Sequence, residues 1–385
     1  MLSRSYKAIV IGAGPGGLAV MKSLLDVGLS KVCWIDKSFK GGRLNELYRE
    51  ISSNTKVGIY LDAVDSSATC RRIIDSSSKP NAMTELEKID RDDTCQLSLA
   101  GDLIEMLEEG ISKNEGVEKI KGEVEKVQLK GSTWFIGLNN HPSPLTTSRL
   151  FLCTGSQPII PSFHLPYNPN LKILDLDRCM VKSTLPALFP KDKKSIVGVI
   201  GNSHSGVLVC RNLFEIHQEK QRELKILNFA RSKIRYAIYR DDGGIVFDNT
   251  GLKGDTAQWS KEHMDNPTED VQEVIEQIDI SSKEEEVYQD RLKECTHLIY
   301  AIGYQPNTYP KMVIDGKEVN QDELIFDQGT SEFRVDGIKK VNGLYGMGIA
   351  HPEKSQDPEG HVENNVGLAK FFKFAEKNQE LWKEE

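Results

Sequence analysis

The segment YKAIVIGAGPGG, residues 6–17, decides the fold because it joins a short apolar run to a glycine-rich turn. The β-branched residues of positions 6–11 predict a buried strand, and apolar spacing over 18–27 predicts a helix that stops near Gly28. A further apolar run, KVCWID at 31–36, predicts a second strand. Strand, glycine turn, helix and strand in this order predict a Rossmann-like nucleotide-binding unit.

Each glycine of this turn has its own physical task. Gly12 permits the tight turn, Gly14 lets backbone N–H groups approach a pyrophosphate, and Gly17 allows close contact between helix and strand. Asp36 follows at about the 20-residue spacing of the dinucleotide fingerprint. Its carboxylate can accept hydrogen bonds from a ribose 2′-hydroxyl but would repel a 2′-phosphate, so FAD or NAD is favoured over NADP at this turn. The alternative is a purely structural glycine turn.

The same pattern recurs in the middle of the chain. The expected elements are a strand at 195–201, a helix at 205–217 and a strand at 224–229. Gly201 and Gly206 keep the turn and close-contact positions, while Ser203 replaces the middle glycine with a side chain that can donate to phosphate. Two such units predict two bound dinucleotides.

The second unit differs from the first at the end of its second strand. The sequence NFARSKIRY places Arg231, Ser232, Lys233 and Arg235 where the first unit has Asp36. Cations in this position suit a 2′-phosphate, which the planar guanidinium group of arginine recognises well. NADPH is therefore favoured over NADH, and a solvated basic turn is the alternative interpretation.

Length and composition narrow the class of protein. The 385 residues predict two or three domains, and 38% hydrophobic with 28% charged residues is typical of a soluble globular chain without a membrane span. A net charge of −8 disfavours a nucleic-acid partner. The seven cysteines include no Cys-x-x-Cys pair, which disfavours a dithiol relay or a metal site. A strand that begins almost at the N-terminus leaves no room for a signal peptide, so a cytoplasmic location is expected.

Two polar segments separate the apolar runs. Residues 62–95 are serine-rich and are predicted to include a mobile surface loop. In the charged segment 253–294, the stretch TEDVQEVIEQI predicts an amphipathic helix. Its inward-facing residues are expected to be Val271, Val274, Ile275 and Ile278.

Two other apolar runs, at 149–161 and 297–307, each end in a glycine followed by a proline. The glycines allow the chain to cross close to a cofactor, and the prolines end strand pairing. The alternative is that the glycine and the proline only end each strand in an ordinary turn.

The motifs GAGPGG (12–17), YREISSNTK (48–56), GNSHSG (201–206) and AIGYQPN (301–307) follow one another in a characteristic order. In these motifs the chain resembles the flavin-dependent monooxygenases and, more broadly, the two-dinucleotide flavoprotein reductases. The resemblance implies an α/β fold with two nested Rossmann-like domains. It implies a discontinuous FAD-binding domain, residues 1–166 and 306–385, with an NADPH-binding domain, residues 167–305, inserted between its parts.

The resemblance also implies roles for individual residues. The asparagine matching Asn54 lies beside the isoalloxazine ring in that family, and an amide offers a donor and an acceptor without adding charge. Asn54 is the leading candidate for the reactive centre, and a turn-capping role is the alternative. The loop Gly41, Gly42 and Arg43 is expected near the flavin.

The C-terminal stretch VNGLYGMGIAHPE, 341–353, resembles the flavin-contacting strand and turn of the family, with Gly346 and Gly348 close to the cofactor. The helix expected to follow from His361 would direct its N-terminus toward the pyrimidine end of the flavin. His351 and His361 flank this turn and are expected at the surface, with a role in proton relay as the alternative.

The candidate site consists of one catalytic residue, Asn54, no metal site and a set of cofactor-binding residues. That set is Gly12, Gly14, Pro15, Gly16, Gly17, Asp36, Lys37, Gly42, Arg43, Thr154, Gly155, Gly201, Asn202, Ser203, Ser205, Gly206, Arg231, Ser232, Lys233, Gly303 and Gly348.

The expected activity is hydride transfer from NADPH to FAD, followed by oxygenation of a small nitrogen- or sulfur-containing nucleophile. The family carries a phenylalanine, glycine and histidine signature before the second glycine loop, whereas residues 171–183 contain no histidine. His164 and His204 lie outside that pattern and are assigned no catalytic role. Two alternatives stay open: an NADPH-dependent reductase or oxidase that uses a small electron acceptor, and a cofactor-binding regulatory protein that senses redox state.

Overall fold

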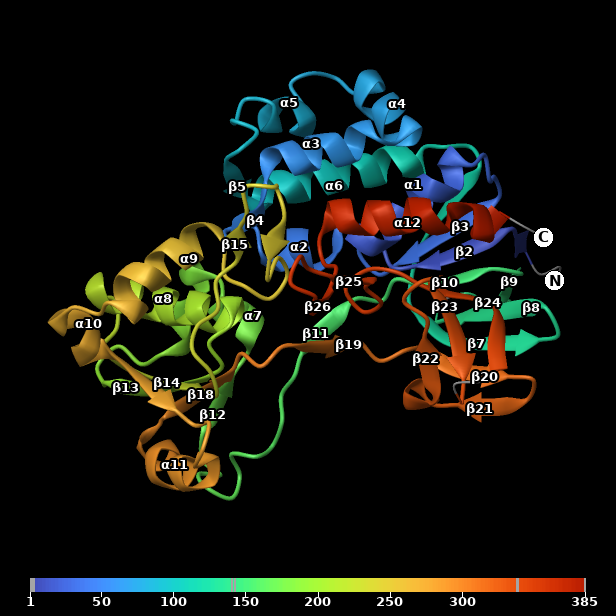
Figure 1. Cartoon of the computed structure of the whole chain (residues 1–385). Coiled ribbons are helices and arrows are strands. Elements are labelled where there is room, and N and C mark those ends of the chain that lie inside the picture. The colour runs from blue at the N-terminus through green and yellow to red at the C-terminus, as the bar shows by residue number, and fades with distance from the viewer. Residues whose placement is uncertain (1–3, 140, 142, 337–338, 384–385) are drawn as a thin grey trace.

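The computed structural model describes residues 4–139, 141, 143–336 and 339–383. Two α/β units lie side by side and are joined by extended chain segments (Figure 1). The first unit combines the N-terminal and C-terminal parts of the chain, and the second is built from the residues between them. This arrangement confirms the predicted fold class of two nested Rossmann-like units.

A mixed sheet forms the centre of the first unit. Within the described residues its seven strands have the order β22 (Leu324–Phe326), β23 (Glu332–Val335), β24 (Lys339–Gly346), β10 (Leu150–Leu152), β2 (Ala8–Ile11), β3 (Val32–Asp36) and β6 (Val117–Lys121). The strands from β24 to β6 are parallel, and β22 and β23 are antiparallel additions. Both faces of β2 are covered, which explains why its sequence is a continuous apolar run.

Alternate residues of β2 and β3 face two different layers. Val10 and Trp34 pack among the helices, whereas Ile9 and Ile35 pack against a second sheet. The helices on this side are α1 (Pro15–Asp26), α6 (Leu97–Ser112) and α12 (Leu368–Lys383). The second sheet has the order β1 (Ser5–Tyr6), β9 (Leu145–Thr147), β8 (Thr133–Leu138), β7 (Val124–Lys130), β20 (Lys311–Ile314) and β21 (Lys317–Val319). The glycine turn after β2 is therefore held in a three-layer core.

Residues 62–95 contain more regular structure than their polar composition indicates, while 77–81 and 87–93 form turns and irregular segments between the elements. The mobility of a surface loop in this stretch stays a prediction. After α3 (Val57–Asp65) the segment forms α4 (Ala68–Ser76) and α5 (Ala82–Leu86) and then β5 (Thr94–Gln96), which pairs with β4 (Ser52–Lys56). Cys70 and Leu86 are fully buried, and the Ser67 hydroxyl caps α4 by accepting a hydrogen bond from the backbone N–H of Cys70. A few apolar anchors and a cap are enough to order a polar segment against the core.

The second unit is built on a parallel sheet. Within the described residues its order is β12 (Lys172–Leu174), β18 (His297–Tyr300), β13 (Ser195–Ile200), β14 (Leu224–Ala230) and β17 (Ile275–Asp279). Its helices are α7 (Leu176–Cys179), α8 (His204–Gln218), α9 (Gly254–Ser260), α10 (Glu269–Val274) and α11 (Glu284–Arg291). The predicted sequence of strand, helix and strand over 195–229 is confirmed.

The predicted amphipathic helix of residues 268–278 is only half correct. Val271, Val274, Ile275 and Ile278 are all buried as expected, but the helix ends at Val274 and the chain continues as β17. The change occurs because Ile275 begins a parallel pairing with β14. Long-range pairing to a sheet edge thus overrides a local helical period.

Extended segments connect the two units. β11 (Ser156–Pro158) pairs antiparallel with β19 (Tyr304–Pro306) between them (Figure 1). Near the C-terminus, β25 (Lys354–Gln356) pairs with β26 (Val362–Asn364), and the next helix, α12, begins only at Leu368. The prediction of a helix that begins at His361 was therefore wrong, because residues 362–364 form strand β26 and the helix begins at Leu368.

The described residues contain no helix that combines the length and apolarity needed to cross a membrane. All seven cysteines lie within the described residues, and each is buried and free.

Candidate functional site

The first glycine loop is shaped by backbone contacts that leave no room for side chains. Gly12 has a φ of +107°, and a Cβ atom there would lie 2.1 Å from the carbonyl oxygen of Cys153. A Cβ atom on Gly17 would lie 1.9 Å from the carbonyl oxygen of Gly12. Gly14, by contrast, precedes α1 with its nearest neighbour 3.7 Å away from such an atom. The loop is tight on its protein side and open in front of the helix N-terminus, as an anion site requires.

Two further chain segments close around this loop. A Cβ atom on Gly42 would lie 2.9 Å from Cα of Gly14, and one on Gly16 would lie 2.7 Å from Cα of Gly348. Four predicted glycines from three parts of the sequence thus form one cradle. Thr154, at the end of β10, has a buried hydroxyl without a hydrogen-bond partner among the described residues. Its free hydroxyl and the cradle fit an elongated dinucleotide.

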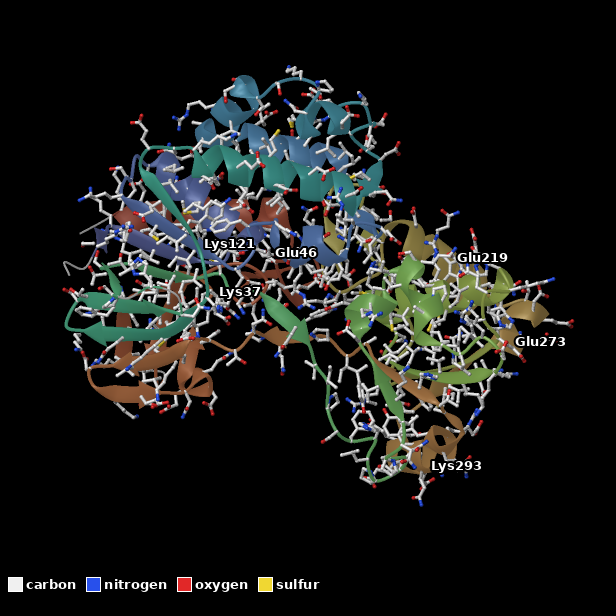
Figure 2. All side chains as sticks on the ribbon, turned by 180° about the vertical axis from the view of Figure 1, so that it is seen from behind. Lys37, Glu46, Lys121, Glu219, Glu273 and Lys293 are labelled. Carbon is white, nitrogen blue, oxygen red and sulfur yellow. The ribbon has the colours of Figure 1, made fainter. Side chains whose placement is uncertain are left out.

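Asp36 is tied to the loop that it follows. One carboxylate oxygen accepts a hydrogen bond from the backbone N–H of Ala13 at 2.8 Å, and the other accepts from the N–H groups of Ser38 and Phe39. Lys37 is exposed and forms an ion pair of 2.6 Å with Glu123. Figure 2 labels Lys37 near Lys121, at the ends of the paired strands β3 and β6. Asp36 therefore braces the loop, while Lys37 points into solvent.

Arg43, in α2 (Gly42–Leu47), binds across the junction of the two units. Its guanidinium pairs with the buried carboxylate of Asp177, which also accepts hydrogen bonds from Tyr48 at 2.6 Å and Tyr304 at 2.8 Å. Asp177 belongs to the segment 171–183, which has no histidine. This segment supplies an aspartate that links the Arg43 loop to the AIGYQPN motif.

The second glycine loop repeats the geometry of the first. Gly201 also has a φ of +107°, and a Cβ atom there would lie 2.3 Å from the carbonyl oxygen of Ala301. A Cβ atom on Gly206 would lie 2.3 Å from the carbonyl oxygen of Gly201. Ser203 precedes α8 and is exposed, so its hydroxyl faces the space before the helix N-terminus. Ser205 lies in the first turn of that helix.

The basic segment after β14 lies at the surface, and its residues differ in their contacts. Arg231 is largely exposed and forms a bidentate pair with Glu284 of α11, at 2.8 and 3.1 Å. The carbonyl oxygen of Ser232 accepts a hydrogen bond of 2.5 Å from the Asn202 side chain, and Lys233 is exposed. The pair with Glu284 uses Nε and Nη2 of Arg231, so the N–H groups of Nη1 are left to donate to a 2′-phosphate, whose negative charge competes with that of Glu284.

A cleft of about 1080 Å³ lies between the two units. Its lining includes Asn54, the residues of the second glycine loop, Gly303 and the start of α12. Gly303 has a φ of +104°, and no atom lies within 4 Å of a Cβ atom built there. Gly155, with a φ of +72°, is similarly open, its nearest neighbour lying 3.5 Å away on Asn307. Both glycines leave the ends of their strands accessible to a ligand.

Asn54 and His204 meet in this cleft. The side-chain amide nitrogen of Asn54 lies 3.3 Å from Nδ1 of His204, the first residue of α8. Burial, assisted by the nearby charge of Lys253, lowers the pKa of His204 to about 4. The ring is therefore neutral at physiological pH. No catalytic role was predicted for His204, and its position directly after Ser203, at the start of the predicted helix, is the signal that could have pointed to it.

His351 is buried rather than exposed, so that prediction was wrong. It packs among Phe326, Phe333 and Tyr309, and its Nε2 atom lies 3.3 Å from the Tyr309 hydroxyl. Burial lowers the pKa of His351 to about 3. The ring stacks directly behind Gly346, where a Cβ atom would lie 2.6 Å from it, and so supports the turn toward Gly348. His361 is exposed as predicted.

No protein-family model matches the chain. Monooxygenase AgnR1 of Paecilomyces divaricatus is 36% identical over 386 residues, covering 97% of this chain and 97% of its own. The ornithine N-hydroxylase KtzI of Kutzneria sp. 744, solved with reduced FAD, NADP+ and L-ornithine, matches with a TM-score of 0.63 and 11% identity over 98% of this chain and 99% of its own. The FAD-bound cadaverine monooxygenase DfoA of Erwinia amylovora matches with a TM-score of 0.59 and 11% identity over 98% and 93%. At 11% identity, these two matches show that the fold is shared and nothing beyond the fold.

Proposed function

The chain belongs to the flavin-dependent monooxygenases, and from this premise we propose that it binds FAD at the first glycine loop and NADPH at the second. In the cleft between the two loops it oxygenates a small nitrogen- or sulfur-containing nucleophile. The observation that carries the proposal is the contact of Asn54 with His204. It brings the predicted reactive-centre residue to the second glycine loop, which is the predicted NADPH site.

The residues of the first unit fit FAD. The cradle of Gly14, Gly16, Gly42 and Gly348 leaves backbone N–H groups open at the N-terminus of α1, and the unpaired Thr154 hydroxyl adds a polar group nearby. We assign residues 1–166 and 306–385 to this FAD-binding domain. Bound FAD supplies the redox chemistry, because it accepts a hydride from NADPH and, once reduced, reacts with oxygen.

The residues of the second unit fit NADPH. Ser203 offers a hydroxyl to a phosphate, and Gly303 leaves the end of β18 open for a nicotinamide. Arg231 and Lys233 supply cations for a 2′-phosphate. We assign residues 167–305 to this domain. A cytoplasmic location is proposed because all seven cysteines are buried free thiols.

Asn54 and His204 have different roles at the reactive centre. The amide of Asn54 can donate and accept hydrogen bonds without adding charge. The neutral ring of His204 holds that amide in place and brings no competing cation. The small molecule that is oxygenated occupies the cleft beside this pair.

The test separates oxygenation from simple oxidation. The FAD-loaded protein is reduced anaerobically with NADPH, mixed with air-saturated buffer and followed for oxygen consumption and hydrogen peroxide release. Peroxide release is expected to lag behind oxygen consumption, and Asn54→Ala is expected to shorten the lag. Asn170→Ala, which changes an exposed asparagine outside the cleft, is the matched control and should keep the lag.

Other outcomes support the other functions. Prompt stoichiometric peroxide from the unaltered protein would contradict oxygenation and support an NADPH-dependent oxidase or reductase. Tight binding of both cofactors without any NADPH consumption would support a redox-sensing regulatory protein.

A further inference from the structure

The cleft wall near Asn54 contains large apolar side chains that are exposed to solvent. Ile59 of α3 is 44% exposed, Tyr239 of β15 (Ile238–Tyr239) is 60% exposed, and Val366 before α12 is 42% exposed. Figure 1 shows β15 beside β4 and β5, the strands that carry and flank Asn54. Exposed apolar side chains around a hollow are typical of a surface that binds the body of an organic ligand.

A cluster of three charged residues lies in the same wall. Asp248 binds Lys253 through one carboxylate oxygen and Lys370 through the other. Burial alone would raise the pKa of Asp248, but the hydrogen bonds from the two lysines outweigh it and hold the pKa below its ordinary value. With the carboxylate ionised and both lysines protonated, this Lys-Asp-Lys cluster carries a net charge of +1.

This positive charge is not balanced within the cleft. Among the described residues that line the cleft, Asp248 is the one carboxylate, against five lysines and arginines. The three cations outside the cluster have carboxylate partners on the rim: Lys56 pairs with Asp92, Arg231 with Glu284 and Arg240 with Asp242. Among the side chains that line the cleft, the Lys-Asp-Lys cluster has one more cation than it has carboxylates. The carboxylate of Glu363 lies behind the cluster, bound to Asn249 and Thr250, and is not part of the lining.

The cluster is also held rigidly and close to the reactive centre. The backbone N–H groups of Asn249 and Thr250 donate to the buried carboxylate of Glu363 at 3.1 and 3.0 Å, and Lys370 donates to the Asn249 side chain at 2.6 Å. A Cβ atom on Gly254, the residue after Lys253, would lie 3.8 Å from the Asn54 side-chain oxygen. The charge of Lys253 also acts on His204, the contact partner of Asn54. A cation in this position favours an anionic group on a bound molecule and repels an ammonium group.

We infer that the substrate is an organic anion with an apolar body, whose body lies against Ile59, Tyr239 and Val366 and whose anionic group faces Lys253 and Lys370. This inference rests on the proposed function, because it names the substrate class of the same cleft. The nucleophilic nitrogen or sulfur is then uncharged, and the carboxylate, sulfonate or phenolate elsewhere on the molecule provides the recognition.

A pair of fluorescent probes tests the charge preference without turnover. 8-Anilinonaphthalene-1-sulfonate and N-phenyl-1-naphthylamine share an apolar body and differ in one sulfonate. Each is titrated into the FAD-loaded protein saturated with NADP+, which fills the phosphate sites. We expect the sulfonate to bind more tightly than the neutral amine, and Lys253→Gln or Lys370→Gln to weaken the sulfonate about five- to tenfold while the neutral amine changes less than about twofold.

The matched control is Lys293→Gln, which removes a lysine that Figure 2 places at the end of the second unit, away from the first. Lys293 is likewise paired with an aspartate, Asp290, at 2.7 Å, and its loss should change neither probe.

Equal binding of the two probes to the unaltered protein would overturn the inference, and so would an unchanged ratio in both glutamine variants. If a glutamine variant loses both probes together, the arginine variants at the same positions decide the question: recovery of the sulfonate preference supports the inference, and its absence contradicts it. These results do not depend on the lag in peroxide release, so a failure of this inference can be told apart from a failure of the proposed function.

Discussion

Asn54 and His204 are 150 residues apart in the sequence, yet the amide nitrogen of Asn54 lies 3.3 Å from a ring nitrogen of His204. Asn54 belongs to β4 of the first unit, and His204 begins α8 of the second. The contact therefore fixes the second glycine loop against the predicted reactive centre.

His204→Leu removes the ring nitrogen that faces Asn54 and is expected to shorten the lag in peroxide release as Asn54→Ala does. His204→Gln keeps a polar partner for the amide and should retain most of the lag. Because the pKa of His204 is about 4, its ring stays neutral from pH 6 to 9, and the lag should show no titration of this residue there. Stopped-flow measurements across that pH range check both expectations. An unaltered lag in His204→Leu would contradict the positioning role.

The first glycine loop allows binding and folding to be separated. An added methyl group at Gly14 has its nearest neighbour at 3.7 Å, so Gly14→Ala should fold normally but bind FAD more weakly, because the methyl group enters the space before α1. Gly17→Ala would place its methyl group 1.9 Å from the Gly12 carbonyl oxygen and should lower the free energy of unfolding by about 2–3 kcal/mol. Urea unfolding of the cofactor-free proteins and fluorescence titration with FAD measure the two effects. Equal FAD affinity of Gly14→Ala and the unaltered protein would argue against a pyrophosphate at this loop.

The pair of Arg231 with Glu284 makes the choice between NADPH and NADH testable. Arg231→Gln removes the candidate ligand of the 2′-phosphate and should lower the ratio of kcat/KM for NADPH to that for NADH by about tenfold. Glu284→Gln frees Arg231 from its partner and should raise that ratio about twofold. Steady-state kinetics with both nucleotides provide the measurement. If Arg231→Gln affects both nucleotides equally, the basic segment after β14 is a solvated turn.

The local patterns were sufficient to predict both Rossmann-like units. Buried parallel strands are continuous apolar runs, and the glycine loops carry a spacing that backbone geometry imposes, so residues 6–36 and 195–229 were identified correctly. The pattern failed where tertiary contacts decide the conformation. Pairing with β14 turned the second half of the predicted helix at 268–278 into β17. Within 62–95, the buried anchors Cys70 and Leu86 hold two helices that the polar composition did not indicate.

The candidate site was predictable only as separate parts. Motif spacing identified Asn54 and the glycines that form the first cradle. The spacing does not indicate which residues of the second unit contact these residues. Asp177 and His204 contribute to the junction of the units through contacts with Arg43 and Asn54. Asp177 belongs to none of the motifs, and His204 belongs to the motif GNSHSG, whose spacing does not indicate which residue of the first unit it meets. The relative placement of the two units is a long-range property.

His351 provides a test of stability against pH. Its pKa of about 3 lies below its ordinary value of 6.5 because the neutral ring is buried. The unfolded chain therefore binds more protons than the folded protein between those two values, and the free energy of unfolding falls as the pH is lowered through 6.5. From pH 7.5 to pH 5, this residue alone should cost the folded protein about 2 kcal/mol.

His351→Gln removes that titration while a polar side chain still faces Tyr309. The variant should be less stable than the unaltered protein at pH 7.5, because a well-packed aromatic ring is lost, and the difference should shrink by about 2 kcal/mol at pH 5. Urea unfolding at the two pH values measures both numbers. His204 and the other titrating groups are present in both proteins, so the change in the difference reports His351 alone. A difference that stays constant between the two pH values would show that the ring accepts a proton as readily in the folded protein as in the unfolded chain, which a neutral ring sealed behind Gly346 does not permit.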